Sequence, residues 1–296
     1  MSLKGFSAAW LALREPADQR ARDPGLLASL TEAVRGRPTL QVVDLGSGSG
    51  SNLRALAPWL PHRQEWWLLD HDAQLLAAVR ERMQQWAVQS GWTSEDEPRP
   101  CLLGAGREVG LRIHQADLAR GLAGAAVPAL RLDSDTLVTG AALLDLVSQD
   151  WLAQLVTDCC TARAMVYFSL SYDGRLRCDP QLPDDPLLQR LVNQHQLRDK
   201  GFGAALGPQA VNVLRQLLAA QGYQCRIARS DWMIGPDEAQ LQRELVNGWA
   251  VAAIEMDANA SARIHPWQAA RCALIAAGHS RLCVGHLDIL ALPGAD

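Results

Sequence analysis

The sequence lacks long apolar runs. No stretch of its 296 residues reaches the roughly 18 uninterrupted apolar residues that a membrane-spanning helix needs. The opening residues MSLKGFSAAW hold a single lysine and no apolar core of signal-peptide length before Arg14 and Glu15. We therefore expect a soluble, cytoplasmic protein without a membrane partner.

An excess of positive charge is also absent. The 28 lysines and arginines are outnumbered by 32 acids, which gives a formal net charge of -4 and a pI near 6.0. Proteins that neutralise nucleic-acid phosphates carry a basic patch or stripe, and this composition indicates none. We expect a small-molecule partner rather than nucleic acid, and the sequence does not indicate an oligomeric state.

Metal-binding and disulfide patterns are missing as well. The seven cysteines include no CxxC spacing, and their odd number in a chain without a secretion signal is not typical of a disulfide framework. We expect reduced thiols and no metal site.

The chain does contain short apolar runs that alternate with longer amphipathic stretches from Leu40 onward. This is the βαβα pattern, and 48% hydrophobic residues are enough to bury a large core. The predicted fold is α/β, a seven-stranded, mostly parallel sheet with helices on both faces. The predicted strands are residues 40–45, 66–70, 111–115, 136–140, 164–170, 224–230 and 281–292.

Other segments surround this alternation. Residues 1–36 predict a helical N-terminal extension, ahead of an α/β domain of residues 37–296. Residues 175–206 and 236–279 interrupt the domain, and we expect these insertions to form a substrate lid. The polar, proline-containing stretch TSEDEPRP at 93–100 predicts a surface loop.

The glycine-rich stretch VVDLGSGSG at 42–50 follows the first predicted strand. Gly46, Gly48 and Gly50 permit positive φ and a close approach of the backbone to a ligand. A helix beginning at Ser51 would direct its N-terminal N–H groups at the same place. Because ligands of parallel α/β sheets bind outside the carboxyl ends of the strands, this turn predicts a nucleotide-type site.

A dinucleotide is the less suitable ligand for this turn. The fingerprint GxGxxG would require glycine where Ser51 stands. Asp44, two residues before the first glycine, would repel a pyrophosphate but suits an ammonium or sulfonium group. The charge pattern therefore favours a cationic cofactor.

The stretch VVDLGSGSG resembles the first motif of the class I S-adenosylmethionine-dependent methyltransferases, an acid followed by GxGxG. WWLLDHD, HQADL and TLVTGAALLDLVS match later segments of that family in the same order. The resemblance covers the chain from about Leu40 onward. It implies a Rossmann-like fold and S-adenosyl-L-methionine as the cofactor.

The resemblance also implies residue roles. Asp70 would accept the ribose hydroxyls, Asp117 would meet the adenine amino group, and Leu118 would supply a backbone contact. Capping the following helix and occupying a turn are the alternative roles of Asp70 and Asp117. The implied cofactor-binding residues are Asp44, Gly46, Ser47, Gly48, Gly50, Asn52, Asp70, His71, Asp117, Leu118 and Thr139.

Charged residues of the N-terminal extension also bear on the cofactor. Arg14, Asp18 and Arg22 recur every four residues, which places them on one helix face and also fits a surface ion ladder. Segments before the first strand of family members often fold over the donor. We therefore predict that Arg22, ahead of Arg14, meets the carboxylate of the methyl donor.

The donor motif does not identify the methyl acceptor. In-line methyl transfer depends on near-attack geometry, and it needs a base only when the acceptor must lose a proton. Asp145, beyond the fourth predicted strand, and His195, within the first insertion, are the catalytic candidates. A helix first-turn acid and a solvated helix face are their alternative roles. For His286 and Asp288, on one face of the last strand, we expect a satisfied core pair.

The predicted function is methyl transfer from S-adenosylmethionine to a small molecule. A methyltransferase acting on protein or RNA and a non-catalytic S-adenosylmethionine-binding protein are the alternatives. The sequence contains neither an NPPY-like segment of amino-methylating DNA enzymes nor the Pro-Cys nucleophile of the ring-methylating class.

Overall fold

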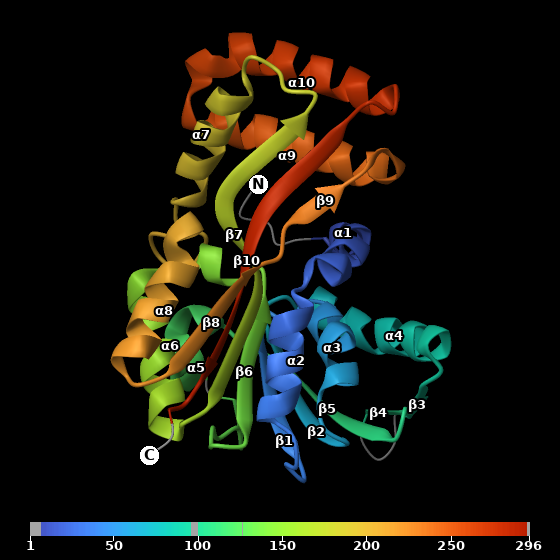
Figure 1. The fold of residues 1–296 in the computed structure, drawn as a ribbon, viewed down its shortest axis with the longest axis vertical. Helices are drawn as coiled ribbons and strands as arrows, with labels where there is room; N and C mark the ends of the chain where they lie inside the picture. The colour runs from blue at the N-terminus through green and yellow to red at the C-terminus, as the bar shows by residue number, and fades with distance from the viewer. Residues whose placement is uncertain (1–6, 96–99, 126, 295–296) are drawn as a thin grey trace.

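One mixed β-sheet organises the chain (Figure 1). The computed structural model describes residues 7–95, 100–125 and 127–294. The strands lie in the order β3-β4-β5-β2-β1-β6-β7-β10-β8, and β9 pairs with β10. Their bounds are β1 (Leu40–Leu45), β2 (Arg63–Asp70), β3 (Thr93–Glu95), β4 (Cys101–Gly104), β5 (Arg107–Gln115), β6 (Thr136–Ala141), β7 (Met165–Asp179), β8 (Gln224–Arg229), β9 (Trp232–Ile234) and β10 (Arg281–Leu292).

All seven predicted strands are present, but the predicted number of strands was wrong. Over the described residues the sheet has ten strands, because β3, β4 and β9 join it. These three are only three or four residues long, too short to show a periodic pattern. The prediction of a surface loop at 93–100 was wrong for Thr93–Glu95, which forms a strand that pairs with β4. Residues 96–99 lie outside the described ranges.

The central strands are parallel, as predicted. β5, β2, β1, β6 and β7 are parallel neighbours, and β10 runs antiparallel between β7 and β8. The register pairs Asp44 with Thr139 and Asp70 with Gln115. The carboxyl ends of β1, β2, β5 and β6 therefore meet at one edge, where ligands of such sheets bind.

Helices cover both faces of the sheet (Figure 1). One face carries α2 (Pro24–Ala33), α3 (Ser51–Leu56) and α4 (Ala73–Ser90), and the other carries α5 (Gly121–Gly124), α6 (Gln149–Ala162) and α8 (Ala210–Ala220). Adjacent strand residues point to opposite cores, Val42 toward α2 and α3 and Val43 toward α6 and α8. Because both faces are buried, β1 is apolar at consecutive positions rather than alternating.

β7 and β10 extend beyond the carboxyl ends of the parallel strands and support a distal lobe, residues 171–196 and 232–285 (Figure 1). It contains β9, α7 (Asp185–Gln196), α9 (Ala239–Met256) and α10 (Ser261–Ala276), which share a core that includes Leu188 and Trp249. Leu170, with φ 57°, follows the last residue of β7 that pairs with β6, whereas the pairing of β7 with β10 continues to Asp179. Most of the two predicted insertions lies in this lobe, beyond the carboxyl ends of the parallel strands. Their function as a lid stays a prediction.

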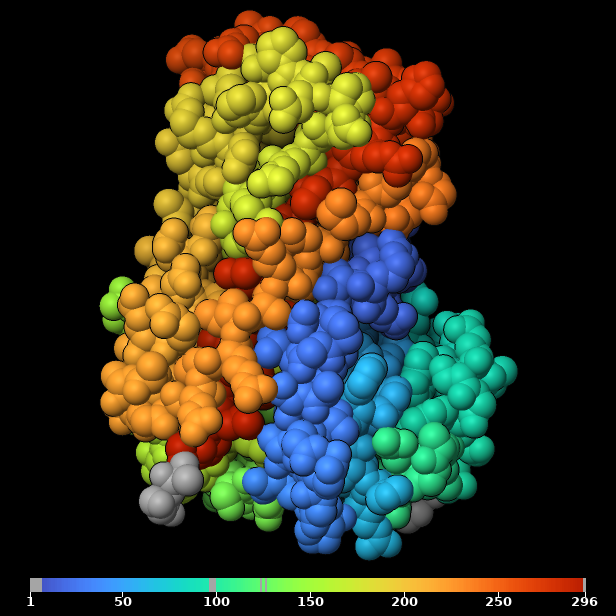
Figure 2. Space-filling view, viewed as in Figure 1, coloured from blue at the N-terminus to red at the C-terminus, as the bar shows by residue number. Residues whose placement is uncertain are grey.

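The N-terminal helix α1 (Ala8–Ala21) lies against the distal lobe (Figure 2), and its Leu11 packs beside Gly48 of the glycine turn. Arg20 forms an ion pair with Glu238 of the lobe, and Glu15 pairs with Arg54 of α3. Ser7 caps α1, and Asp23 caps α2. The predicted helical extension is thus two helices, with residues 1–6 outside the described part. No helix in the described ranges is long and apolar enough to cross a membrane.

Candidate functional site

The glycine turn joins β1 to α3 in a left-handed backbone conformation. Gly46, Gly48 and Gly50 have φ values of 65°, 54° and 82°, which side chains disfavour. A Cβ on Gly48 would also come within 3.1 Å of Cδ1 of Leu11 on α1. The left-handed conformation, and at Gly48 the contact with Leu11, therefore explain why glycines occupy these positions. The backbone at the carboxyl end of β1 is consequently not covered by side chains of the turn.

Asp70 ties this turn to the end of β2. Its Oδ2 accepts a 2.8 Å hydrogen bond from the Gly48 N–H, and its Oδ1 accepts one of 2.9 Å from the N–H of Asp72. Asp72, rather than Asp70, caps α4. His71 is exposed, with Nδ1 3.4 Å from Oδ1 of Asp70. Asp70 is thus buried at the edge of the turn and shapes it directly.

Asp44, Asn52 and Thr139 form a buried polar group beneath the turn. Nδ2 of Asn52 donates to Oδ1 of Asp44 at 2.8 Å and to Oγ1 of Thr139 at 3.2 Å. Burial raises the pKa of Asp44 to about 7, against the lowering effects of the Asn52 hydrogen bond and the Arg22 charge. The carboxyl group is therefore easily ionised by a cation brought beside it.

Several buried atoms around the turn have no hydrogen-bond partner within the described residues. They include Oδ2 of Asp44, Oγ of Ser47 and Oδ1 of Asn52. Buried polar atoms in folded proteins are nearly always paired, so such a concentration needs an explanation. A polar ligand seated on the turn would satisfy these atoms. These oxygen atoms also fit the predicted cofactor, because its ammonium and hydroxyl groups donate hydrogen bonds and its sulfonium carries a positive charge.

Arg22 lies at the end of α1 on the same side of the sheet. Its Nη1 donates to Oγ of Ser169 at 2.6 Å, and its Nε is unpaired among the described residues. Its charge lowers the pKa of Asp44, near the carboxyl end of β1, and of Asp288 in β10. Sequence reasoning missed Ser169, although a serine within the apolar run AMVYFSL was a usable signal.

Asp117 and Leu118 follow β5, two strands away from β1. The exposed Asp117 caps the short 3-10 helix η2 (Leu118–Arg120) by accepting from the Ala119 N–H at 3.1 Å. Leu118 is buried, and its carbonyl accepts from Nε1 of Trp151 at 2.6 Å. The end of β5 is thus held in place by α6, with the carboxylate of Asp117 at the surface.

Asp145 lies in the 3-10 helix η3 (Leu144–Leu146), which follows β6. It is 6% exposed, and its Oδ1 has no partner in the described part of the chain. Burial raises the pKa of Asp145 to about 6, while backbone N–H groups, including that of Tyr172, and the charges of Arg14 and Lys200 oppose the rise. A carboxylate with this pKa is suited to accept a proton near neutral pH.

His195 of α7 has a partner at each ring nitrogen. Nε2 lies 3.1 Å from Oε2 of Glu255 on α9, and Nδ1 lies 3.2 Å from Nζ of Lys200. Burial lowers the pKa of His195, helped by the Lys200 charge. The structure therefore places His195 inside the distal lobe as a link between α7 and α9, and the solvated helix face is ruled out as its environment because the side chain is buried.

Arg14 and Asp18 of α1 face the distal lobe. Arg14 forms a buried pair with Asp18, and its guanidinium lies 4.9 Å from the ring centre of Trp232. His286 packs on the same tryptophan, with ring centres 5.0 Å apart. The expected satisfied pair of His286 and Asp288 was half wrong. Asp288 accepts from the Leu170 N–H at 2.8 Å, whereas Nδ1 of His286 has no partner in the described ranges.

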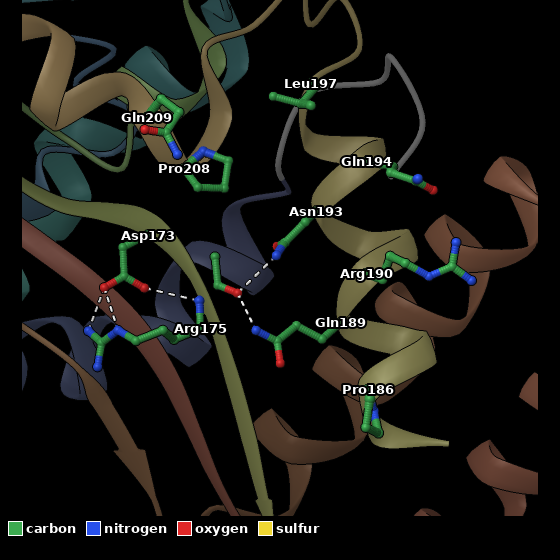
Figure 3. A pocket seen from close by; sticks show the side chains of 11 residues that line it. Asp173, Arg175, Pro186, Gln189, Arg190, Asn193, Gln194, Leu197, Pro208 and Gln209 are labelled. Atoms are coloured by element: carbon green, nitrogen blue, oxygen red, sulfur yellow. Dashed lines mark hydrogen bonds and ion pairs between the residues drawn. The ribbon is translucent and has the colours of Figure 1, made fainter. Parts of the chain in front are cut away.

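A pocket of about 730 Å³ opens elsewhere, between β7, α7 and the 3-10 helix η4 (Gly207–Gln209) (Figure 3). Its wall includes the ion pair of Asp173 with Arg175, and the Gly174 carbonyl, which accepts from Gln189 and Asn193. None of the predicted site residues lines this pocket. The predicted cofactor residues therefore define a different place in the molecule.

Comparison with known proteins supports the fold. No family model matches this sequence, and no curated protein matches it. A cyclopropane-fatty-acyl-phospholipid synthase-like protein from Lactobacillus casei superposes with a TM-score of 0.52 at 12% identity, covering 99% of this chain and 96% of that chain. The topology and this superposition show that the chain has the class I methyltransferase fold.

Two further solved structures resemble the chain more weakly. A cyclopropane synthase from Mycobacterium tuberculosis gives a TM-score of 0.46 at 11% identity, covering 96% of this chain and 94% of that one. A SAM-dependent methyltransferase from Geobacter sulfurreducens, solved with S-adenosyl-L-homocysteine, gives 0.45 at 13% identity, covering 97% and 98%.

Proposed function

We propose that this protein is an S-adenosylmethionine-dependent methyltransferase acting on a small molecule. The observation that carries the proposal is the set of unpartnered buried atoms of Asp44, Ser47 and Asn52 around a left-handed glycine turn, within the described residues. The class I methyltransferase fold supports it, since such a turn lies where ligands of these sheets bind.

The polar residues around the turn would hold different parts of the cofactor. Asp70 would accept from the ribose hydroxyls, and Asp44 with Asn52 would face the cationic amino-acid end. Arg22, with its unpaired Nε, would meet the carboxylate at that end. Asp117 and Leu118 would border the adenine. When bound, the cofactor supplies an electrophilic methyl group, and the residues named here orient it and exclude water.

A small acceptor is supported by the charge and by the shape of the molecule. The net charge of -4 gives no general attraction for nucleic-acid phosphates. The distal lobe and α1 lie beyond the carboxyl ends of the strands (Figure 1), and Asp145, which follows β6 at that end, is buried. A buried acceptor site admits a small molecule or a single side chain more readily than a folded macromolecule.

Titration calorimetry with S-adenosylmethionine tests the cofactor assignment. The wild type should bind, and Asp70→Ala should weaken binding at least about tenfold, because one or two charge-assisted hydrogen bonds are worth about 1.5–3 kcal/mol each. Asp237→Asn, at an exposed position in the distal lobe, is the control and should bind normally. Absence of binding by the wild type, or unchanged affinity in a folded Asp70→Ala, would reject the site.

A folding check is necessary because Asp70 also holds the Gly48 N–H. Asp70→Asn keeps one acceptor oxygen for that bond and loses only the bond from the Asp72 N–H, so it should retain the fold with a modest loss of stability and still lose affinity. Catalysis itself is tested by transfer of a labelled methyl group to a cellular metabolite fraction. Binding without transfer to any fraction would support the non-catalytic alternative.

A further inference from the structure

A second group of buried polar side chains lies where α1 meets η3 and the distal lobe. Asp145 and His286 are 6% and 5% exposed, and Oδ1 of the first and Nδ1 of the second have no partner in the part of the chain described. Arg14 of α1 lies 4.9 Å from the ring centre of Trp232, on which His286 packs with ring centres 5.0 Å apart. The Arg14 charge also lowers the pKa of both Asp145 and His286. Two such atoms in one place indicate a ligand.

Tyr172 connects these two groups. Its backbone N–H interacts with the Asp145 carboxyl group, and its ring meets the His286 ring edge-on with centres 6.4 Å apart. Its hydroxyl donates to Asn193 of α7 at 2.7 Å, which fixes the ring. Asp145, Tyr172 and His286 therefore come from three different elements to one position. Leu143, two residues before Asp145, lies 3.4 Å from where a Cβ on Gly46 would stand, so this position is next to the glycine turn.

The cations near this position are already committed to other partners. Nε and Nη2 of Arg14 donate to the two carboxylate oxygens of Asp18 at 2.9 and 3.1 Å. Nζ of Lys200 lies 3.2 Å from Nδ1 of His195. One neutral donor, Nε1 of Trp10, also lacks a partner among the described residues and stands one helical turn before Arg14. The position thus offers acceptors and a neutral donor.

We propose that Asp145 and His286 bind the methyl acceptor, and that the acceptor is a nucleophile carrying its own proton, an amine or a hydroxyl group. This inference rests on the proposed function. The nucleophile's nitrogen or oxygen bonds to the methyl carbon, the carbon–sulfur bond breaks with its electron pair on sulfur, and the nucleophile's proton passes to Oδ1 of Asp145. His286 orients the acceptor by a second hydrogen bond.

A carboxylate acceptor is disfavoured by the same arrangement. It would add a negative charge beside Asp145 while Arg14 and Lys200 stay paired elsewhere. Burial raises the pKa of Asp145 to about 6, so the side chain is mostly ionised at pH 7.5. Burial lowers the pKa of His286 to about 3, helped by Arg14 and opposed by Asp231 and the Val284 carbonyl, so the ring is neutral.

The first test uses S-adenosylmethionine with a labelled methyl group and the small-molecule fraction of a cell extract. The products should be stable to mild alkali, as N-methyl and O-methyl ether products are, and mass spectrometry then distinguishes amine from hydroxyl acceptors. Label released by alkali as methanol would mean a methyl ester and would overturn the inference while leaving the proposed function intact. Binding of the cofactor without any transfer would reject both.

Variants test the two residues separately. Asp145→Asn should lower kcat at least about 100-fold, the usual scale of general base catalysis, with little change in cofactor affinity. His286→Gln should mainly raise KM. The wild-type rate should fall below a pH near 6, and this acid limb should be absent from the residual activity of Asp145→Asn. Asp237→Asn should match the wild type, and unchanged kinetics in both site variants would contradict the assignment.

A readout independent of activity uses the protein without cofactor. Carbon NMR of labelled aspartate carboxyl groups should show, besides the Asp44 titration near pH 7, one near pH 6 that disappears in Asp145→Asn. Propylamine, protonated at this pH, should shift that midpoint downward, and propionate, with the same number of carbons, should not. A midpoint that propionate moves, or that neither compound moves, would overturn the inference.

Discussion

The buried carboxyl group of Asp44 should make the protein less stable as pH rises, and Asp44→Asn should remove this effect. Its pKa is raised from 3.8 to about 7 by burial. The folded state therefore binds a proton more tightly than the unfolded state does. Stability from this group is fully present below pH 4, is lost between pH 4 and 7, and stays lost above pH 7.

One pKa unit is worth about 1.4 kcal/mol, so the loss reaches about 4 kcal/mol at pH 8. Asp44→Asn keeps an oxygen that accepts from Asn52, carries no charge, and should approach that gain at pH 8. At pH 4 its stability should lie within about 1 kcal/mol of the wild type. The same substitution should weaken cofactor binding, so the carboxyl group of Asp44 lowers stability at high pH but is kept for function.

Urea unfolding of both proteins at pH 4, 6 and 8 measures this difference. Asp237→Asn, exposed and far along the chain from the turn, should follow the wild type at every pH. A difference between wild type and Asp44→Asn that does not grow with pH, or a variant less stable than the wild type at pH 8, would refute the reasoning.

Three other outcomes are expected. S-adenosylmethionine binding near pH 7 should release protons, because a cation beside Asp44 favours its ionised form; calorimetric enthalpies that do not vary with the ionisation enthalpy of the buffer would contradict this. Gly50→Ala should destabilise more than Gly91→Ala, the matched control, in thermal unfolding. Both glycines have a left-handed backbone conformation, in which an alanine costs about 1–2 kcal/mol of stability. Only at Gly50 would the new Cβ also clash with a methionine side chain of α4. Breaking the partly buried pair of Arg54 and Glu15 with Arg54→Met should cost up to about 3 kcal/mol in urea unfolding. Adding Glu15→Gln should recover part of the loss, and no recovery would show that the loss comes from the bond of Arg54 to the Ser49 carbonyl instead.

Local patterns explain what the sequence could predict. Strand cores such as 40–45 and 136–141 are apolar because both sheet faces are covered, and this is visible in short windows. The left-handed glycines and the acids near them follow from residue type and spacing. Asp44, Asn52 and Asp70 gather at the turn because parallel strands end together, so their meeting was predictable from the fold class.

The acceptor side depends on contacts between distant segments. His286 and Tyr172 meet only because β10 inserts between β7 and β8, with register shifts on each side of the contact. Arg14 reaches them from α1, a helix whose sequence also fitted a surface ion ladder. No short window contains this arrangement, which is why the sequence predicted a satisfied pair for His286 and a catalytic role for His195, with a solvated helix face as its alternative.

The central position of β10 also bears on how the chain reaches its fold. β7 and β8 do not pair with each other; each pairs with β10, which joins Arg281 to Asp179 and Leu292 to Gln224. Contacts of such long sequence separation slow folding. On the ribosome, β7 and β8 must wait with open hydrogen-bonding edges until β10 emerges, and unpaired edges are prone to aggregation. β10, the strand that carries His286, must therefore be synthesised before β7 and β8 can complete their pairing in the sheet.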